Sequence, residues 1–166
     1  MYDYVLQLGF ENKTKTTVQE LKRYLKEHKI EDKERVWLPH ITIDLYNCKN
    51  QEQFIEKVEM IVRNIQPIKL QFKNLNDFEK ETLYIEPYNK TKLIKIKEMC
   101  NKELREYRLE KRKDMIYKPH VTLCTNENIE EAYELAIKKF KSFEGKIIYL
   151  WIYNQKQELI KEYHLR

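Results

Sequence analysis

Two short segments of the chain, 80 positions apart, have almost the same sequence. Residues 37–43 read Trp-Leu-Pro-His-Ile-Thr-Ile, and residues 117–123 read Tyr-Lys-Pro-His-Val-Thr-Leu. Their β-branched and aliphatic residues predict a strand in each segment, and the two-residue spacing places each histidine on the same strand face as its threonine. Because the chain has only four histidines and four prolines, the repetition indicates a duplication and not a coincidence.

The elements around the two segments recur in the same order. After a strand at residues 2–9, apolar spacing predicts a helix at 15–29, a strand at 40–46, a helix at 51–65 and a hairpin of strands at 68–76 and 82–86. The second half is predicted to contain a helix at 91–108, a strand at 120–124, a helix at 129–140 and a hairpin of strands at 146–153 and 158–164.

We therefore predict a single domain over residues 1–166, with an internal repeat at about 11–87 and 91–166. The expected fold class is α+β, bilobed and pseudo-twofold. Each half has helices packed on an antiparallel sheet, and the two histidine strands meet at a central cleft. A chain of 166 residues that is 42% hydrophobic is large enough to bury one sizeable core.

The composition excludes several kinds of chemistry. With only Gly9 and Gly145, the chain cannot build a glycine-rich phosphate loop, so no nucleotide cofactor is expected. The only serine, Ser142, lies in a charged segment that does not resemble a nucleophile elbow. The three cysteines are widely spaced and form no Cys-x-x-Cys pair, so the sequence predicts neither a disulfide framework nor a metal site.

Charge and hydropathy suggest the compartment and the type of ligand. A net charge of +5 suits an anionic substrate. The first residues alternate as in a strand and include an acidic residue at position 3, unlike a signal peptide, and no apolar run approaches the length of a membrane span. We expect a cytoplasmic protein that acts as a monomer, without a membrane partner.

The paired histidines indicate a specific kind of catalysis. Two imidazoles with an ordinary pKa of about 6.5 can be one neutral and one protonated at pH 7. Either His40 or His120 can then take a proton from an attacking water or hydroxyl, while the other histidine protonates the leaving oxygen of a phosphodiester. The hydroxyls of Thr42 and Thr122 can donate to the non-bridging oxygens, where negative charge develops. This scheme requires no metal ion.

The two His-x-Thr-aliphatic motifs in a duplicated α+β chain resemble the two-histidine (2H) phosphoesterase superfamily, and within it the LigT-like, 2′-5′ RNA ligase group. The resemblance implies two lobes of antiparallel sheet and helices around a cleft. It also implies that His40 and His120 are the catalytic pair and that Thr42 and Thr122 bind phosphate. Members act on 2′,3′-cyclic phosphates, 2′-5′ linkages or related nucleotides without metal or ATP.

Five further residues beside the motifs are candidates for substrate binding. Lys118 precedes its histidine by two positions, where it can face a phosphate, and Trp37 and Tyr117 are aromatic residues that can stack on a base. By strand parity, Asp44 and Cys124 share the faces of their histidines, so each either lines the cleft or packs at a strand end. No basic residue directly follows either threonine.

Other segments allow two interpretations each. The basic run at residues 105–113 is either a mobile rim of the cleft or a solvated helix end, and the second interpretation is preferred. Four more aromatic residues near the motifs or on the hairpins can stack on a base or fill the core: Tyr84, Tyr88, Trp151 and Tyr153.

We expect an enzyme that opens 2′,3′-cyclic phosphates of RNA ends or small nucleotides to 2′-phosphates, with 2′-5′ RNA ligation when an RNA 5′-hydroxyl replaces water. The alternative is a non-catalytic protein that binds RNA ends or nucleotides in the same cleft. A metal-dependent hydrolase would need more convergent carboxylates or histidines than the motifs provide.

Overall fold

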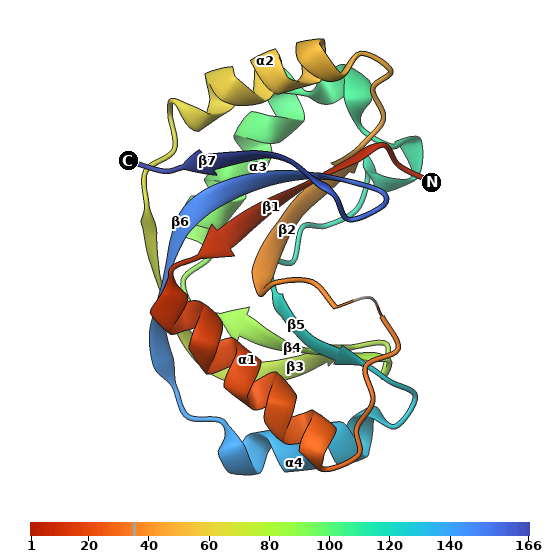
Figure 1. Ribbon diagram of the computed structural model, residues 1–166, viewed down its shortest axis with the longest axis vertical. Coiled ribbons are helices and arrows are strands. Elements are labelled where there is room, and N and C mark those ends of the chain that lie inside the picture. The colour runs from red at the N-terminus through yellow and green to blue at the C-terminus, as the bar shows by residue number, and fades with distance from the viewer. Residues whose placement is uncertain (35) are drawn as a thin grey trace.

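The structure is a computed structural model that describes residues 1–34 and 36–166. Within these ranges, four α-helices and one seven-stranded antiparallel sheet form two lobes (Figure 1). In chain order the elements are β1 (Tyr4–Phe10), α1 (Asn12–Glu27), β2 (His40–Tyr46), α2 (Gln51–Val62), β3 (Ile68–Phe78), β4 (Thr82–Pro87), α3 (Thr91–Glu103), β5 (Val121–Thr125), α4 (Ile129–Lys139), β6 (Phe143–Asn154) and β7 (Leu159–His164). The sequence predicted each of these elements, with shifted ends.

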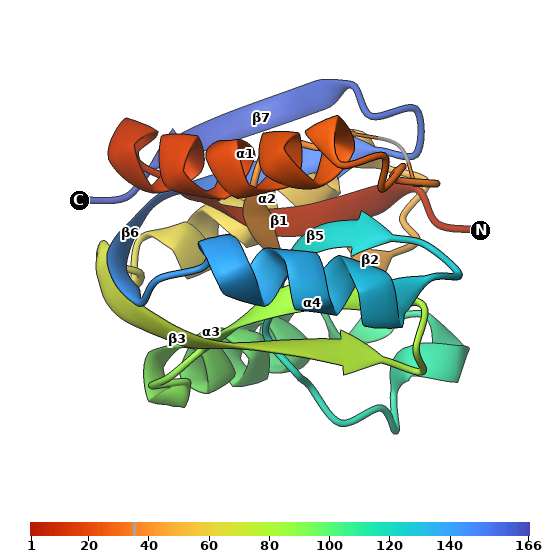
Figure 2. The same ribbon diagram turned by 90° about the horizontal axis from the view of Figure 1, so that it is seen from below.

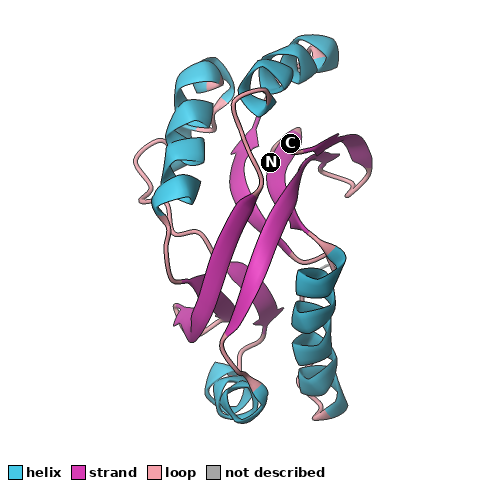
Figure 3. Cartoon of the chain, turned by 90° about the vertical axis from the view of Figure 1, so that its left-hand side faces the viewer, coloured by secondary structure: helices cyan, strands magenta, loops and turns pink. Residues whose placement is uncertain are grey.

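The long strand β6 belongs to both lobes. Its first residues, 143–147, pair with β3, while residues 149–154 pair with β1 on one side and reach β7 on the other. We call β2, β1, the end of β6 and β7 the His40 lobe, and β5, β4, β3 and the start of β6 the His120 lobe. The strands lie inside and the helices outside (Figure 3).

The lobes are built by exchange between the two halves of the sequence. The hairpin β3-β4 from the first half pairs with β5 from the second, and the hairpin β6-β7 from the second half pairs with β1. Each lobe also has one helix from each half of the sequence: α2 and α3 pack together on the His40 lobe, whereas α1 and α4 cover the His120 lobe (Figure 2). The bilobed α+β fold is confirmed, but neither lobe corresponds to the predicted repeats at 11–87 or 91–166.

Helices α1 and α3 occupy equivalent places and share one pattern of buried residues. In α1 the apolar positions are Val18, Leu21 and Leu25, and in α3 the same spacing recurs at Leu93, Ile96 and Cys100. Each pattern is the apolar stripe of an amphipathic helix that rests on a sheet. The pseudo-twofold relation therefore extends from the strands to the individual residues of these helices.

Helix α3 is shorter than predicted, because the chain turns into two short 3₁₀ helices, Arg105–Tyr107 and Glu110–Arg112, instead of continuing to residue 108. The side chains of Leu104 and Tyr107 are buried at this turn. Arg108 then forms an isolated bridge with Tyr46 at the end of β2. In the part of the chain that the structure describes, no helix has the length and apolar character needed to span a bilayer.

Candidate active site

Strand β2 of the His40 lobe and strand β5 of the His120 lobe lie next to each other where the two lobes meet (Figure 1). Their motif residues line one cavity of about 330 Å³, together with residues from α1, the α1–β2 connection and the β3–β4 hairpin. The lining residues are Lys22, Asp32, Glu34, Trp37, Leu38, Pro39, His40, Thr42, Phe78, Thr82, His120, Thr122 and Thr125. The structure thus brings together both histidines and both threonines that the sequence singled out.

The His40 ring is held by a bond to its own connecting segment. Its Nδ1 lies 2.7 Å from the carbonyl oxygen of Leu38, and its Nε2 lies 3.1 Å from Oγ1 of Thr42. A carbonyl oxygen can only accept, so Nδ1 must carry the hydrogen. In the neutral ring Nε2 is then the acceptor, and it is the nitrogen available for proton transfer.

The His120 ring repeats this arrangement in the other lobe. Its Nδ1 lies 2.7 Å from the carbonyl oxygen of Lys118, which again leaves Nε2 as the reactive nitrogen. Two aromatic rings fix the imidazole: Phe78 at 4.7 Å between ring centroids and Tyr84 at 5.2 Å. The side chain of Lys118, which was predicted to face a phosphate, is exposed and does not line the cavity. Lys118 acts on the site through its backbone carbonyl, which holds the His120 ring.

Both imidazoles have pKa values below the ordinary value of about 6.5. Burial lowers the pKa of His40 to about 4, the hydrogen bond to Leu38 opposes this, and the charges of Lys22 and His120 lower it further. Burial also lowers the pKa of His120, with a contribution from Arg112. Both shifts favour the neutral imidazole in the ligand-free protein, whereas the expected catalysis needs one of the two rings protonated. A bound phosphate would raise both pKa values.

The parity prediction for Asp44 and Cys124 is wrong, because each motif strand contains a β-bulge. Leu6 pairs with Asp44 but Gln7 with Thr42, which leaves Ile43 as the extra residue in β2. In β5 the extra residue is Leu123, since neighbouring residues of β4 pair with Cys124 and Thr122.

An extra residue reverses the alternation of side chains along the strand. Asp44 and Cys124 therefore turn away from the cavity and are buried, and Thr125 lines it instead.

Asp44 is the centre of a buried charged cluster. Its carboxylate accepts from Nζ of Lys97, from Nε of Arg108 at 3.3 Å and from Nε of Arg112 at 2.6 Å, and the residue is only 1% exposed. Burial opposes ionisation, but the bonds from Lys97 and Arg112 hold the pKa of Asp44 below its ordinary value. The side chains of Arg108 and Arg112 are thus partly buried, 11% and 27% exposed, and they reach inward to a buried carboxylate. Neither interpretation of the basic run describes these two residues.

The two aromatic residues before the motifs have different positions. Trp37 lines the cavity, with its ring 5.9 Å from the His40 ring and 5.2 Å from that of Tyr153. Tyr117 is not among the lining residues. Its hydroxyl donates to the carbonyl oxygen of Thr42 at 2.9 Å, which ties the second motif to the first motif strand. Tyr117 therefore positions β2.

Of the other aromatic candidates, Tyr84 contacts the His120 ring and Tyr153 packs against Trp37. Tyr88 is exposed below the ammonium of Lys73, and Trp151 is buried with its Nε1 donating to Glu162 at 2.8 Å. The Trp151 ring packs over Gly9, where a Cβ would lie 2.5 Å from it. That close approach explains the glycine opposite His40 in the register of β1 and β2.

The sequence reasoning missed several lining residues, chiefly Lys22, Asp32 and Thr125. Lys22 comes from α1, which the repeat pattern did not place beside β5. Asp32 accepts hydrogen bonds through Oδ1 from the backbone N–H groups of Thr125 at 3.0 Å and Glu34 at 3.1 Å, so it fixes the α1–β2 connection against β5. The only available signal was the spacing shared by α1 and α3, which aligns Lys22 with Lys97.

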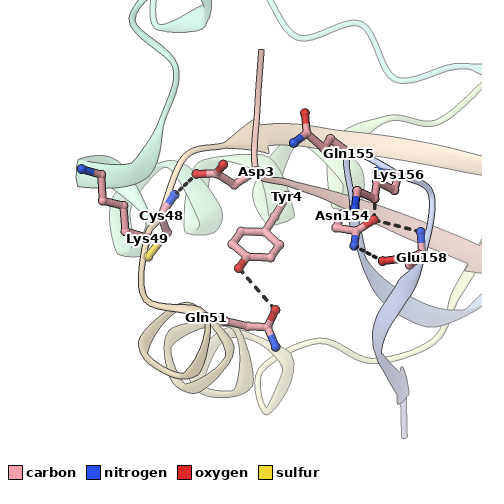
Figure 4. Close-up of a pocket in the computed structure, with 9 residues that line it drawn as sticks. All are labelled: Asp3, Tyr4, Cys48, Lys49, Gln51, Asn154, Gln155, Lys156 and Glu158. Atoms are coloured by element: carbon pink, nitrogen blue, oxygen red, sulfur yellow. Dashed lines mark hydrogen bonds between the residues drawn. The ribbon is translucent and has the colours of Figure 1, made fainter.

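A second cavity, of about 370 Å³, lies at the other end of β1 (Figure 4). Its lining residues are Asp3, Tyr4, Cys48, Lys49, Gln51, Asn154, Gln155, Lys156 and Glu158. Asp3 accepts from the backbone N–H of Cys48 at 2.9 Å, and the Tyr4 hydroxyl donates to Gln51 at 3.4 Å. These bonds join the first strand to the start of α2. Across residues 1–34 and 36–166, no three His, Cys, Asp or Glu side chains gather in a group that could hold a metal ion.

Comparison with solved structures places the fold among known proteins. The chain superposes on TT0787 of Thermus thermophilus with a TM-score of 0.69 and 11% identity, covering 99% of this chain and 98% of that one. The match to Escherichia coli LigT complexed with 3′-AMP has a TM-score of 0.65, 11% identity and the same coverage. Kluyveromyces marxianus Usb1 matches with a TM-score of 0.55 and 9% identity, over 98% of this chain and 97% of that one.

A comparison with curated proteins gave no match. The family model of the 2′-5′ RNA ligase superfamily, in contrast, matches residues 10–157, which include both motifs and strands β2 to β6. This match extends over most of the chain. The chain therefore belongs to the 2′-5′ RNA ligase superfamily.

Proposed function

We propose that the protein is a metal-independent phosphoesterase that opens 2′,3′-cyclic phosphates at RNA ends or on small nucleotides. The observation that carries this proposal is the pairing of two histidines in one cavity, each with Nδ1 bound to a backbone carbonyl, which leaves Nε2 as the nitrogen that can accept a proton. Binding alone does not need two such groups. The superfamily assignment agrees with this chemistry.

In the proposed reaction, one imidazole takes a proton from water as the water oxygen bonds to phosphorus. The bond from phosphorus to the 3′ oxygen breaks, and the other imidazole, protonated beforehand, gives its proton to that oxygen. The product carries a 2′-phosphate, and the two imidazoles have exchanged protonation states. The hydroxyls of Thr42 and Thr122 donate to the non-bridging oxygens. An RNA 5′-hydroxyl in place of water gives a 2′-5′ linkage by the same steps.

Two observations favour a nucleotide as the substrate. E. coli LigT has been crystallised with 3′-AMP, ATP and NADP⁺, and this chain shares its fold. In this chain the Trp37 ring lies in the cavity wall next to His40, where an aromatic surface can stack on a base. Both observations support small nucleotides as substrates beside RNA ends.

The decisive experiment uses an oligonucleotide that ends in a 2′,3′-cyclic phosphate, incubated with the protein in excess EDTA. We expect conversion to a 2′-phosphate end, identified by mass spectrometry and by resistance to a 3′-specific phosphatase. Tight binding without turnover would instead support the non-catalytic alternative. Turnover that EDTA abolishes and Mg²⁺ or Zn²⁺ restores would contradict the metal-independent mechanism.

We predict an acidic optimum for kcat/KM. This parameter follows the pKa values of the free protein, and the reactive form has one neutral and one protonated imidazole. That form is most populated between the two pKa values, of which one is about 4 and the other is also lowered. The rate should therefore fall as the pH rises from 6 to 8. Initial rates over pH 4 to 8 measure it, and a maximum at or above pH 7 would contradict the prediction.

A further inference from the structure

Lys22 and Lys97 occupy equivalent positions in the two lobes. Lys22 directly follows Leu21, and Lys97 directly follows Ile96, the middle residues of the apolar triplets in α1 and α3. Each helix packs beside a motif strand, α1 beside β5 and α3 beside β2. Lys97 is buried, and its ammonium pairs with the carboxylate of Asp44 on β2. The pseudo-twofold relation places Lys22 next to the corresponding residue of β5.

That corresponding residue is Cys124. Like Asp44, it directly follows the bulge residue of its strand and lies two positions after the motif threonine. Burial raises the pKa of Cys124 to about 11, so its thiol is neutral at pH 7 and offers no charge to an ammonium group. The strand partner that holds Lys97 is thus missing for Lys22.

Lys22 lines the cavity instead. Across residues 1–34 and 36–166, no carboxylate lies within salt-bridge distance of its Nζ. The carboxylates of Asp32 and Glu34 line the same cavity, but Oδ1 of Asp32 is already bound to two backbone N–H groups. Desolvation lowers the pKa of Lys22, and the charge of Asp32 opposes this.

We propose that Lys22 contacts the substrate phosphate from α1, as a cation in the wall of the cavity that holds both motif histidines. This inference rests on the proposed function and names a further binding residue for it. A phosphodiester is an anion, and neutral imidazoles and hydroxyls provide only dipoles for it. A charge-assisted hydrogen bond from an ammonium group is about twice as strong as a neutral one. Because Cys124 has no charge where Asp44 has a carboxylate, the ammonium group of Lys22 remains available to a phosphate.

The test compares Lys22→Met with Lys26→Met, an exposed lysine one turn further along α1. A hydrogen bond to a charged group contributes about 1.5–3 kcal/mol, so we expect Lys22→Met to lower kcat/KM on a 2′,3′-cyclic nucleotide by about 10- to 100-fold. Lys22→Arg should retain part of the activity, and Lys26→Met should match the wild type. Loss of kcat/KM below threefold in Lys22→Met would overturn the proposal.

A second variant tests the comparison between the lobes. Cys124→Asp provides the carboxylate that the other lobe has, so it should draw Lys22 away from the cavity and reproduce the loss seen in Lys22→Met. Cys124→Ala is the control for the altered core and should keep kcat/KM. If both Cys124 variants have the same kcat/KM while thermal melts show both folded, the lobe comparison is wrong.

Two readouts do not depend on turnover. Inorganic phosphate should bind the wild type, as followed by NMR shifts of the histidine ring protons, and Lys22→Met should weaken this binding about tenfold or more. In the free protein, Lys22→Met should also raise the pKa of His40, which faces Lys22 and His120. Phosphate binding that depends on Lys22 in a protein without turnover would contradict only the proposed function. No phosphate binding, or binding that is unchanged in Lys22→Met, would overturn the role of Lys22.

Discussion

Replacing either His40 or His120 by alanine is expected to lower kcat on a 2′,3′-cyclic phosphate by about 10²- to 10⁴-fold, the usual contribution of a positioned acid or base. In the proposed mechanism each imidazole performs one of the two proton transfers that the reaction requires, so loss of either blocks the same step. The double variant should therefore be little slower than the single variants. Single-turnover rates, measured with protein in excess, separate this effect from product release.

The matched control is His28→Ala. His28 is exposed at the end of α1, and its ring bonds to the carbonyl of Tyr24, outside the cavity. Its removal should leave kcat unchanged. If His28→Ala loses as much activity as the motif variants, the loss reflects general damage to the protein. If His40→Ala or His120→Ala retains full activity, the acid–base assignment is wrong.

Asp44→Ala is expected to destabilise the fold by about 3–5 kcal/mol, the usual effect of removing one partner of a buried ion pair. The change would leave the charges of Lys97, Arg108 and Arg112 close together without their common carboxylate. Urea denaturation followed by circular dichroism measures the difference. Glu110→Ala is the control, because Glu110 pairs with Lys113 at the surface and such pairs contribute about 0–1 kcal/mol.

The same cluster gives stability a particular pH dependence. The pKa of Asp44 is lower in the folded state than its ordinary value of 3.8. The stabilisation of the folded state by ionised Asp44 is therefore complete above its ordinary pKa, and it is lost as the pH falls through the lower pKa of the folded state. Asp44→Ala should flatten this part of the stability curve. An unfolding free energy within 1 kcal/mol of the wild type at pH 7 would show that the cluster does not support the fold.

Local patterns in the sequence were sufficient to predict the elements and the four motif residues. The apolar positions of α1, for example, repeat at helical spacing, and each proline before a motif histidine marks the start of its strand. The bulges at Ile43 and Leu123 left no such trace, because a strand with one extra residue still reads as an ordinary run of aliphatic and polar side chains. The faces of Asp44 and Cys124 were predicted wrongly for this reason.

The position of Lys22 could not be predicted for a different reason. A linear repeat suggests that α1 covers β2, the next strand along the chain, whereas the exchange of hairpins places α1 on the His120 lobe. Which helix covers which strand depends on pairings between distant segments, and those pairings are not encoded in a local pattern. The third charged partner of Asp44, Arg112, was missed in the same way, because its contact spans the two halves of the sequence.

The exchange also determines when the cavity can exist during synthesis of the chain. Strand β1 is made before its two partners, because it pairs with both β2 and the end of β6, where Tyr4 lies opposite Asn154. The start of β6 is likewise the neighbour of β3, so neither lobe is complete until β6 has emerged from the ribosome. Such distant pairings give a high contact order and slow folding. The sheet connects the strands of His40 and His120 through β6, so the native arrangement of the two histidines requires a strand that is made after both motifs.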